Sequence, residues 1–349
     1  MKVRGLLTAM AFVSAILATQ CVGQELTKPL VTDPVYTRPQ TLVDMDHGRR
    51  MNIYCLGEGS PTVILDSGMG DSTVSWALVQ PMIASKTRVC AYDRAGLGFS
   101  DGSMRASTAS HSADDLHALL KAAHIAPPYV LVGHSAAGMY VRVFADHYRD
   151  EVVGIVSVEG SHEDQSVRGW AIGAPGQKDK WDEFLRAQSA CVDDARHGLV
   201  RGTPEYKKCV GDPDSRFSQS INDAQAAYKA TPRWQAAVAS ERQAIFYQSA
   251  DETRATRRSF GDMPIIVLTH SPYPKSKNES QEERDHRTLL WESLHLDVAS
   301  MSTRGINEIV PNSTHYIQLE HPQIVVDAVN QAVAISRDDA ASHQATPSR

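Results

Sequence analysis

A serine in a glycine-rich turn is the residue of this chain best placed to carry out chemistry. An apolar run at residues 129–132 is followed by Gly-His-Ser-Ala-Ala-Gly, with the serine at position 135. This spacing is close to Gly-x-Ser-x-Gly, a strand-to-helix turn that lifts a serine hydroxyl above a sheet. Ala137 replaces the last glycine, which is a mild departure because alanine is also small. The helix N-terminus that follows would place the Ala136 N–H where an oxyanion forms. The pattern predicts that Ser135 is a nucleophile.

A serine hydroxyl needs a base within hydrogen-bond reach, and the base needs an orienting acid. His315 lies in a small polar stretch between the strand-like run 306–310 and the last helical pattern. A loop at this place would carry the imidazole toward Ser135. His270 also ends a strand-like run, but it precedes the usual place of the base, and His134 would point away from the serine. We therefore expect His315 to be the base.

The acid has two candidate locations. Glu159 closes the apolar run 152–158, where a carboxylate is costly unless it has a partner such as an imidazole N–H. The other location follows the run 265–269, but no carboxylate lies close to its end. We favour Glu159 as the orienting acid. The nearest later carboxylates belong to a polar charge run, typical of a solvated loop: Glu279, Glu282, Glu283 and Asp285.

A second oxyanion donor is expected in the glycine-rich turn at residues 66–70. The turn follows a strand-like run, and Gly68 and Gly70 would let the backbone approach a ligand. The N–H of Met69 is the natural donor. A dinucleotide site is not supported, because Thr73 stands where a third glycine would be needed.

Short apolar runs rich in valine and isoleucine alternate with helical patterns along the chain. Such runs are typical of parallel strands buried on both faces of a sheet. The alternation predicts an α/β fold with a mostly parallel eight-stranded sheet and helices on both faces. The strand-like runs are 41–45, 51–56, 62–65, 88–92, 129–132, 152–158, 265–269 and 306–310.

The alternation stops between His162 and Gly261, where helical patterns carry many polar and aromatic residues. This stretch is expected to be an inserted helical cap whose aromatic side chains could line a substrate pocket. Residues 271–287 are polar and predict an exposed loop. The expected organisation is a signal peptide at 1–23, a core in two parts at 24–161 and 262–336, a cap at 162–261, and a disordered tail at 337–349.

The pattern of the N-terminus predicts an export signal. A basic start precedes an apolar run at 6–18 that is too short to span a bilayer, and small residues follow before Gln24. We expect a periplasmic or secreted protein. Cys21 is similar to the cysteine of a lipoprotein signal, but Gln20 before it is a poor fit, so lipidation of Cys21 stays open.

The composition of the chain limits the classes of partner that can be expected. The chain has 349 residues, a formal net charge of −6, 42% hydrophobic and 22% charged residues. This is ordinary for a globular protein, and the charge gives no reason to expect nucleic acid or an anionic membrane surface as a partner. After the N-terminal run, no segment is long and apolar enough to span a membrane. A small-molecule substrate is expected, and the oligomeric state is left open.

Export would place the cysteines in an oxidising compartment. The chain has five cysteines, and loss of Cys21 leaves four, an even number that suggests two disulfides. Four cysteines allow three pairings, and spacing alone does not choose among them. We predict Cys55–Cys90 and Cys191–Cys209, because the first two lie in strand-like runs and the last two in the cap. Neither a Cys-x-x-Cys pair nor clustered histidines suggest a metal site.

Taken together, these motifs resemble the α/β-hydrolase family, in the branch with a helical cap. The resemblance covers about residues 42–333 and is carried by the turns around Ser135 and Met69, by Tyr-Asp-Arg-Ala-Gly at 92–96, and by Ser-Thr-His ending at His315. It implies Ser135 as nucleophile, His315 as base, and the N–H groups of Met69 and Ala136 as oxyanion donors, with no metal or organic cofactor. Cys55 and Cys90 would then lie on neighbouring strands.

Three departures from the family pattern bear on the site. Ser67-Gly68 replaces the usual His-Gly of the oxyanion turn, Ala137 replaces a glycine, and the common acid position is empty, which favours Glu159. We expect an exported serine hydrolase that cleaves carboxylic esters through an acyl-enzyme on Ser135. The alternatives are an amidase or peptidase, a lactonase or a metal-free perhydrolase with the same triad, or a non-catalytic binding protein of the same fold.

Overall fold

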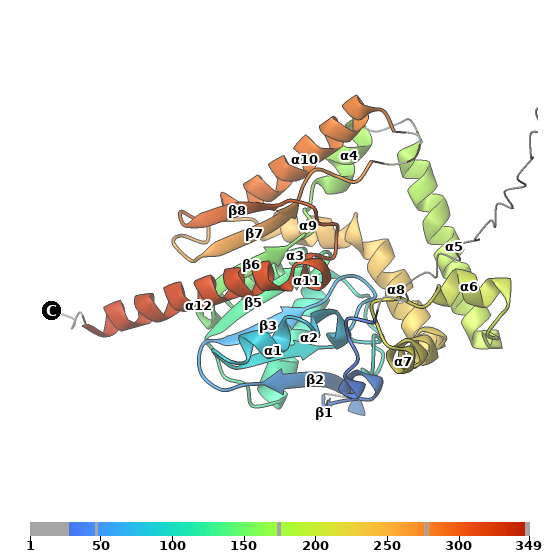
Figure 1. Ribbon diagram of the computed structural model, residues 1–349, viewed down its shortest axis with the longest axis horizontal. Helices are drawn as coiled ribbons and strands as arrows, with labels where there is room; N and C mark the ends of the chain where they lie inside the picture. The colour runs from blue at the N-terminus through green and yellow to red at the C-terminus, as the bar shows by residue number, and fades with distance from the viewer. Residues whose placement is uncertain (1–27, 46–47, 173–175, 276, 278, 346–349) are drawn as a thin grey trace, which may run out of the picture.

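An eight-stranded sheet runs through the centre of the molecule (Figure 1). The computed structural model describes residues 28–345 except 46–47, 173–175, 276 and 278, so the expected signal peptide and Cys21 lie outside the described residues. The strand order is β1-β2-β4-β3-β5-β6-β7-β8. β2 is antiparallel to both its neighbours, and all the other pairs are parallel. The strands are β1 Thr41–Asp44, β2 Arg50–Leu56, β3 Thr62–Asp66, β4 Val89–Tyr92, β5 Tyr129–His134, β6 Val152–Val158, β7 Ile265–His270 and β8 Gly305–Val310.

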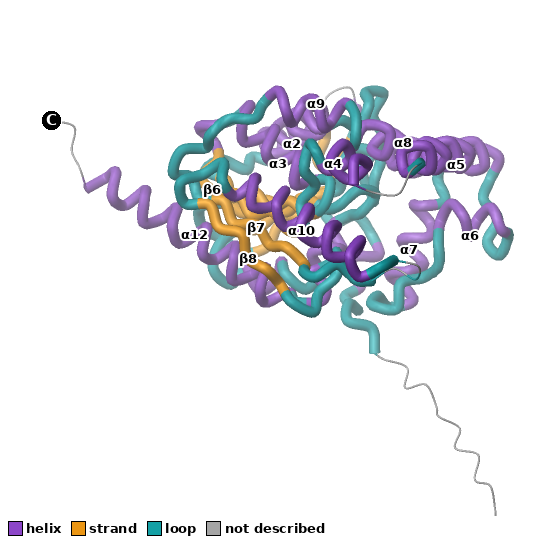
Figure 2. Tube along the Cα trace, turned by 90° about the horizontal axis from the view of Figure 1, so that it is seen from above, coloured by secondary structure: helices purple, strands orange, loops and turns teal. Residues whose placement is uncertain are grey.

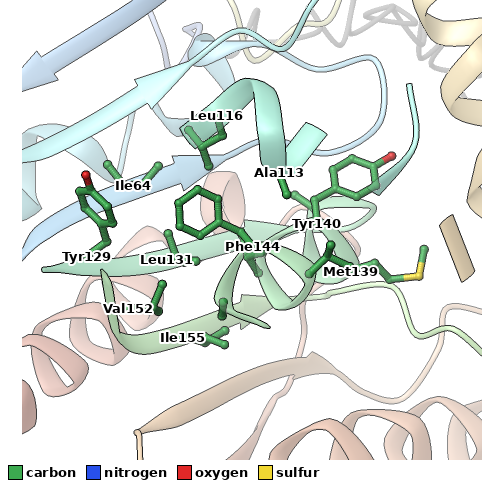
Figure 3. Close-up of a cluster of buried hydrophobic side chains, with 14 of the residues drawn as sticks. Ile64, Ala113, Leu116, Tyr129, Leu131, Met139, Tyr140, Phe144, Val152 and Ile155 are labelled. Carbon is green, nitrogen blue, oxygen red and sulfur yellow. The ribbon is translucent and has the colours of Figure 1, made fainter. Parts of the chain in front are cut away.

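The central strands are buried on both faces, as their apolar sequences predict. Every residue of β3, β4, β5 and β7 is buried. Alternate residues face opposite layers: Ile64 and Leu131 pack into one hydrophobic cluster, and Val63 and Val130 into another. Figure 3 shows part of the first cluster, where Phe144 of α3 lies against the strands. The mostly parallel sheet with helices on both faces is thereby confirmed.

Helices cover each face of the sheet. α2 and α3 pack over the first cluster, while α12 crosses the other face against β5, β6 and β7. The C-terminal part of α12 projects at one end of the molecule, and α5 and α6 lie at the opposite end (Figures 1 and 2). The helices of the core are α1 Gln80–Ile83, α2 Ala109–Ala122, α3 Ala137–His147, α10 Gln281–Ala299, α11 Ile317–Glu320 and α12 Pro322–Ala345, with short 3-10 helices η1 Pro34–Thr37, η3 Thr73–Trp76 and η4 Arg149–Glu151.

Between β6 and β7 the chain forms the helices α4 to α9, which we call the inserted helices. The first of them begins at Gln165, close to where the sequence places the start of a cap and shortly after β6 ends at Val158. Within the described residues, no helix is long and apolar enough to cross a membrane. The inserted helices are α4 Gln165–Ile172, α5 Gln177–His197, α6 Pro204–Val210, α7 Gln219–Lys229, α8 Pro232–Ile245 and α9 Gln248–Ala255.

Two segments are helical where the sequence predicts irregular structure. α10 begins at Gln281, inside the expected loop 271–287, because Ser280 and Glu283 cap each other's backbone N–H groups. α12 continues to Ala345, although the sequence predicts a disordered tail from residue 337. A bidentate ion pair between Arg304 and Asp339, with contacts of 3.0 and 2.6 Å, ties the start of this last part to the residue before β8, while the end of the helix projects.

The structure pairs the four remaining cysteines as the placement of their segments suggests. Cys55 and Cys90 are opposite each other on β2 and β4, and Cys191 on α5 is bonded to Cys209 on α6. Their sulfur atoms are 2.06 Å apart in both pairs.

Peptide mapping of the mature protein under non-reducing conditions should find these two bonds. The bonds close loops of sequence separation 35 and 18. Loop-closure entropy then gives each about 3 to 4 kcal/mol of stability. Replacing both Cys191 and Cys209 by serine should therefore lower the free energy of unfolding by about 3 kcal/mol in urea titrations. Crossed pairs, or free thiols throughout, would contradict the pairing.

Candidate active site

The candidate residues come together because parallel strands end at one edge of the sheet. Met69 follows β3, Ser135 follows β5, Glu159 follows β6, and His315 follows β8. Residues far apart in the sequence are therefore placed side by side by the strand order alone. β5 lies between β3 and β6, so Ser135 is flanked by the turns that carry Met69 and Glu159.

Ser135 occupies a tight turn between β5 and α3. Its φ angle is +54°, a left-handed conformation that few residues other than glycine adopt. The backbone fixes this turn from three directions: Ser135 N donates to Val158 O at 3.1 Å, and Ser135 O accepts from Gly138 N at 2.9 Å and from Ser161 N at 2.7 Å. The serine is thus held in a strained conformation by hydrogen bonds, as a nucleophile elbow requires.

The glycines of the turn stand where a side chain would not fit. A Cβ on Gly133 would lie 2.5 Å from Ala137 O, and one on Gly138 would lie 2.5 Å from the Cα of Gly160. The close approach therefore needs glycine at 138, one residue later than the usual pattern. Ala137 itself is buried without exposure to solvent.

Ser135 and His315 line one cavity of about 380 Å³, together with Met69 and Ala136. Ala136 lies at the N-terminus of α3, an 11-residue helix, so its N–H lies at the positive end of the helix dipole. The cavity wall is mostly apolar or aromatic, from the inserted helices and from α10: Trp181, Ile245, Phe246, Leu290, Trp291 and Leu294. The structure thus places the predicted nucleophile, base and oxyanion donors on one concave surface.

Glu159 lies behind His315 and is fully buried. His315 Nδ1 is 3.4 Å from Glu159 Oε2, so the imidazole has a carboxylate on the side of its Nδ1 atom. The backbone of Glu159 is itself unusual, with a φ of +51°, and its N–H donates to Leu268 O at 2.9 Å. The structure brings together the acid and the base that the sequence favours.

Two residues that the sequence did not assign to the site also hold Glu159. The backbone N–H of His270 donates to Oε1 at 2.6 Å, and His270 Nδ1 lies 2.5 Å from Oε2. Trp291 Nε1, on α10, donates to both carboxylate oxygens at 3.2 Å. α10 packs against β7 (Figure 1), and Trp291 on this helix reaches Glu159, which follows β6. Only the fold joins these residues, so no local pattern could have identified them.

These donors keep Glu159 ionised. Burial alone raises the pKa of the carboxyl group, but the hydrogen bonds from His270 and His315 outweigh it and lower the pKa from 4.5 to about 2. Asp285, the competing candidate, is exposed on α10 and accepts from the side chain of Gln281 at 2.8 Å. It is not among the groups found around His315.

His134 supports the loop that carries His315. Its Nε2 is 2.8 Å from the carbonyl oxygen of His315, so Nε2 carries the proton and donates. Burial, followed by the charge of His315, lowers the pKa of His134 to about 3, and the ring is therefore neutral. His134 thus ties the Ser135 turn to the His315 loop through this hydrogen bond.

The turn that carries Met69 is held by a buried charged network. Arg94 contacts Asp66 Oδ1 at 2.6 Å and Glu241 Oε1 at 2.8 Å, and it donates to the carbonyl oxygens of Ser67 and Gly68. Glu241 Oε2 in turn accepts from the N–H of Gly70 at 2.8 Å. The backbone on both sides of Met69 is thus held in place, as a preorganised hydrogen-bond donor requires.

Removing Arg94 should strongly destabilise the protein. All three charged side chains of the network are at most 5% exposed, so Arg94→Met leaves Asp66 and Glu241 buried without their cation. We expect a loss of about 3 to 5 kcal/mol in the free energy of unfolding, measured in urea. The matched control is Arg50→Met, whose ion pair with Asp101 is exposed and should change stability by less than about 1 kcal/mol. Equal effects of the two variants would contradict the importance of the network.

Comparison with known proteins assigns the family. The family model described as alpha/beta hydrolase fold matches residues 61–287, more than half of the chain. With the sheet order and the turn at Ser135, this shows that the chain belongs to the α/β-hydrolase family.

The individual relatives are distant. "Uncharacterized protein YqjL" of Bacillus subtilis (strain 168) is 23% identical over 269 residues, which is 77% of this chain and 82% of the relative. "Probable oxidoreductase EphD" of Mycobacterium tuberculosis (strain ATCC 25618 / H37Rv) is 30% identical over 323 residues, 85% of this chain. The match covers only 50% of EphD, so this chain corresponds to about half of that protein.

The names of solved structures with the same fold describe different enzyme activities. The epoxide hydrolase CorEH without ligand has a TM-score of 0.57 and 20% identity, covering 84% of this chain and 98% of that one. A thermophilic esterase from Thermogutta terrifontis has a TM-score of 0.55 and 19% identity, covering 86% and 99%. At these identities the likeness shows the fold, and the chemistry has to be argued from the site itself.

Proposed function

We propose that this hydrolase is an exported serine esterase that cleaves small carboxylic esters through an acyl-enzyme on Ser135. The observation that carries the proposal is the shared cavity of Ser135, His315, Met69 and Ala136, with Glu159 behind His315. Nucleophile, base, acid and oxyanion donors are the complete set for acyl transfer.

The reaction follows from the roles that these residues would have in acyl transfer. Glu159 accepts from His315 Nδ1–H, so His315 Nε2 is free to take the proton from Ser135 Oγ as this oxygen attacks the ester carbonyl carbon. The N–H groups of Met69 and Ala136 stabilise the oxyanion. His315 returns the proton to the departing alcohol, which leaves an acyl ester on Ser135. A water molecule, deprotonated by His315, then attacks this ester, and Ser135 regains its proton as the acid is released.

The nature of the nucleophile argues against epoxide opening, although a structural neighbour is named for it. A carboxylate that opens an epoxide forms an ester, which water can hydrolyse. A serine oxygen that attacked an epoxide carbon would instead be left in an ether, and the oxyanion donors would have no carbonyl on which to act. Acyl transfer is the chemistry that both uses Ser135 and regenerates it.

Export is proposed from two features. Residues 1–23 have the basic, apolar and small-residue order of a signal peptide, and the rest of the chain holds two disulfides. The apolar and aromatic cavity wall supports a substrate with an apolar acyl or alcohol group.

The test is covalent labelling combined with a substrate panel. A fluorophosphonate probe should label the wild-type protein once, and peptide mass spectrometry should place the label on Ser135. Hydrolysis of p-nitrophenyl esters of graded chain length should exceed hydrolysis of matched anilides, lactones and epoxides. Faster cleavage of anilides or lactones would redirect the substrate class, whereas absence of labelling and of all hydrolysis would favour a binding protein.

A further inference from the structure

A second histidine lies against the carboxylate of Glu159. His270, at the end of β7, is 2% exposed, and its Nδ1 is 2.5 Å from Glu159 Oε2. Its backbone N–H donates to the other oxygen at 2.6 Å. The ring of Tyr273 packs edge-on against the imidazole with the ring centres 4.3 Å apart. His270 therefore contacts both oxygens of the acid and has little room to move.

Glu159 decides which ring nitrogen of His270 must carry a proton. An ionised carboxylate can only accept, so the Nδ1 atom that faces Glu159 Oε2 is protonated. Among the described residues, Nε2 has no hydrogen-bond partner, and Nδ1 approaches Glu159 Oε2 to 2.5 Å without the alignment of a regular hydrogen bond. The side chain of His270 thus reaches the acid through this Nδ1 contact, in addition to the hydrogen bond from its backbone N–H.

Two imidazoles meet at one oxygen of Glu159. His270 Nδ1 is 2.5 Å from Oε2, and His315 Nδ1 is 3.4 Å from the same atom. The two rings differ in exposure, because the side chain of His315 is 43% exposed and that of His270 is buried. The orientation of the carboxylate is therefore set by the buried side, through His270 and Trp291, before His315 uses it.

We propose that His270 is a positioning residue, whose Nδ1–H holds Glu159 Oε2 where the same oxygen accepts from His315. The inference rests on the proposed function, because it assumes that His315 is the base. It also explains the empty acid position at the end of β7: the residue at that place supports the acid that stands at the end of β6. His270 does not touch the substrate in this arrangement and acts only through Glu159.

The test compares three replacements of His270. The asparagine Nδ2 can reach the place of histidine Nδ1, whereas glutamine places its amide nitrogen one carbon further and leucine has no donor. His270→Leu should lower kcat by about 10- to 100-fold, since misplacement of a catalytic group by about 1 Å has effects of this size. KM should stay within about twofold, because a positioning effect on the acid acts on the transition state. His270→Asn should recover most of kcat, and His270→Gln should not.

The outcomes separate this inference from the proposed function. His286→Leu, an exposed histidine on α10, is the control for a general effect of losing an imidazole. If the wild type is active and His270→Leu keeps the full kcat, the positioning role alone is overturned. The same holds if the Asn, Gln and Leu variants all lose kcat equally. A wild type that neither hydrolyses esters nor takes the fluorophosphonate label overturns both proposals. If His270→Leu does not fold by circular dichroism, the difference between Asn and Gln decides.

Discussion

Replacing Ser135 by alanine should abolish ester hydrolysis and leave the fold intact. Loss of the nucleophile in a serine triad lowers kcat on the order of 10⁶-fold, so the remaining rate should approach that of the oxyanion donors acting on water. Alanine keeps a Cβ at the strained position, and the hydrogen bonds of the turn are made by the backbone of Ser135. The free energy of unfolding should therefore change little.

The control for this variant is another serine of the same cavity. Ser161 also lines the cavity, and its N–H donates to Ser135 O. Ser161→Ala should still accept the fluorophosphonate label, and Ser135→Ala should not. If the label persists in Ser135→Ala and disappears in Ser161→Ala, the assignment of the nucleophile is wrong.

Glu159→Gln should lower kcat by about 10⁴-fold, the cost of removing the orienting carboxylate in a well-studied triad. The glutamine amide is nearly the same size, but both oxygens of Glu159 accept hydrogen bonds. The NH₂ group must therefore face an N–H donor wherever it is placed, and His315 loses the anion that stabilises its charged form. Asp285→Asn is the matched control on α10 and should keep nearly the full rate. If Asp285→Asn were nearly inactive and Glu159→Gln were active, the orienting acid would have to be assigned to the segment after β7.

The pH dependence gives an independent check on Glu159. Its folded pKa of about 2 lies below the ordinary 4.5, so the ionised group contributes stability above about pH 4.5, and this contribution is lost as the pH falls through about 2. The wild type should therefore lose stability below pH 4.5 by an increment that Glu159→Gln lacks, measured by thermal unfolding across pH. If kcat/KM falls as the pH is lowered toward 4.5, protonation of Glu159 is not the cause, because this group stays ionised in that range. Identical pH profiles of stability in the two proteins would contradict the low pKa.

The sheet was predictable because buried parallel strands leave a strong local pattern. The runs 62–65, 129–132 and 265–269 are observed as strands that start at the same residues and extend by one or two more. Parallel strands end at the same edge of a sheet. A correct prediction of the strands therefore also predicts that the residues at their ends, such as Ser135 and Glu159, lie close together.

The supporting residues were not predictable, since their role depends on contacts across the fold. His270 and Trp291 are 111 and 132 residues from Glu159 in sequence, and Glu241 is 147 residues from Arg94. α10 was missed for a different reason. Its first two turns are polar and mostly exposed, and its buried apolar residues come only near its end, at Leu294, Val298 and Ala299. The capping pair Ser280 and Glu283 was the local signal that could have revealed it.

The contact between Arg94 and Glu241 has a consequence for protein engineering. Glu241 belongs to α8, one of the inserted helices, while Asp66 ends β3 and Arg94 lies in the loop that follows β4. A chimaera that carries a relative's inserted helices on this sheet would bring a substrate pocket of new shape. Without an acid at the place of Glu241, however, it would leave the guanidinium with one carboxylate fewer and Gly70 N–H without its acceptor. Recombination between members of this family should therefore exchange residues 94 and 241 as a pair.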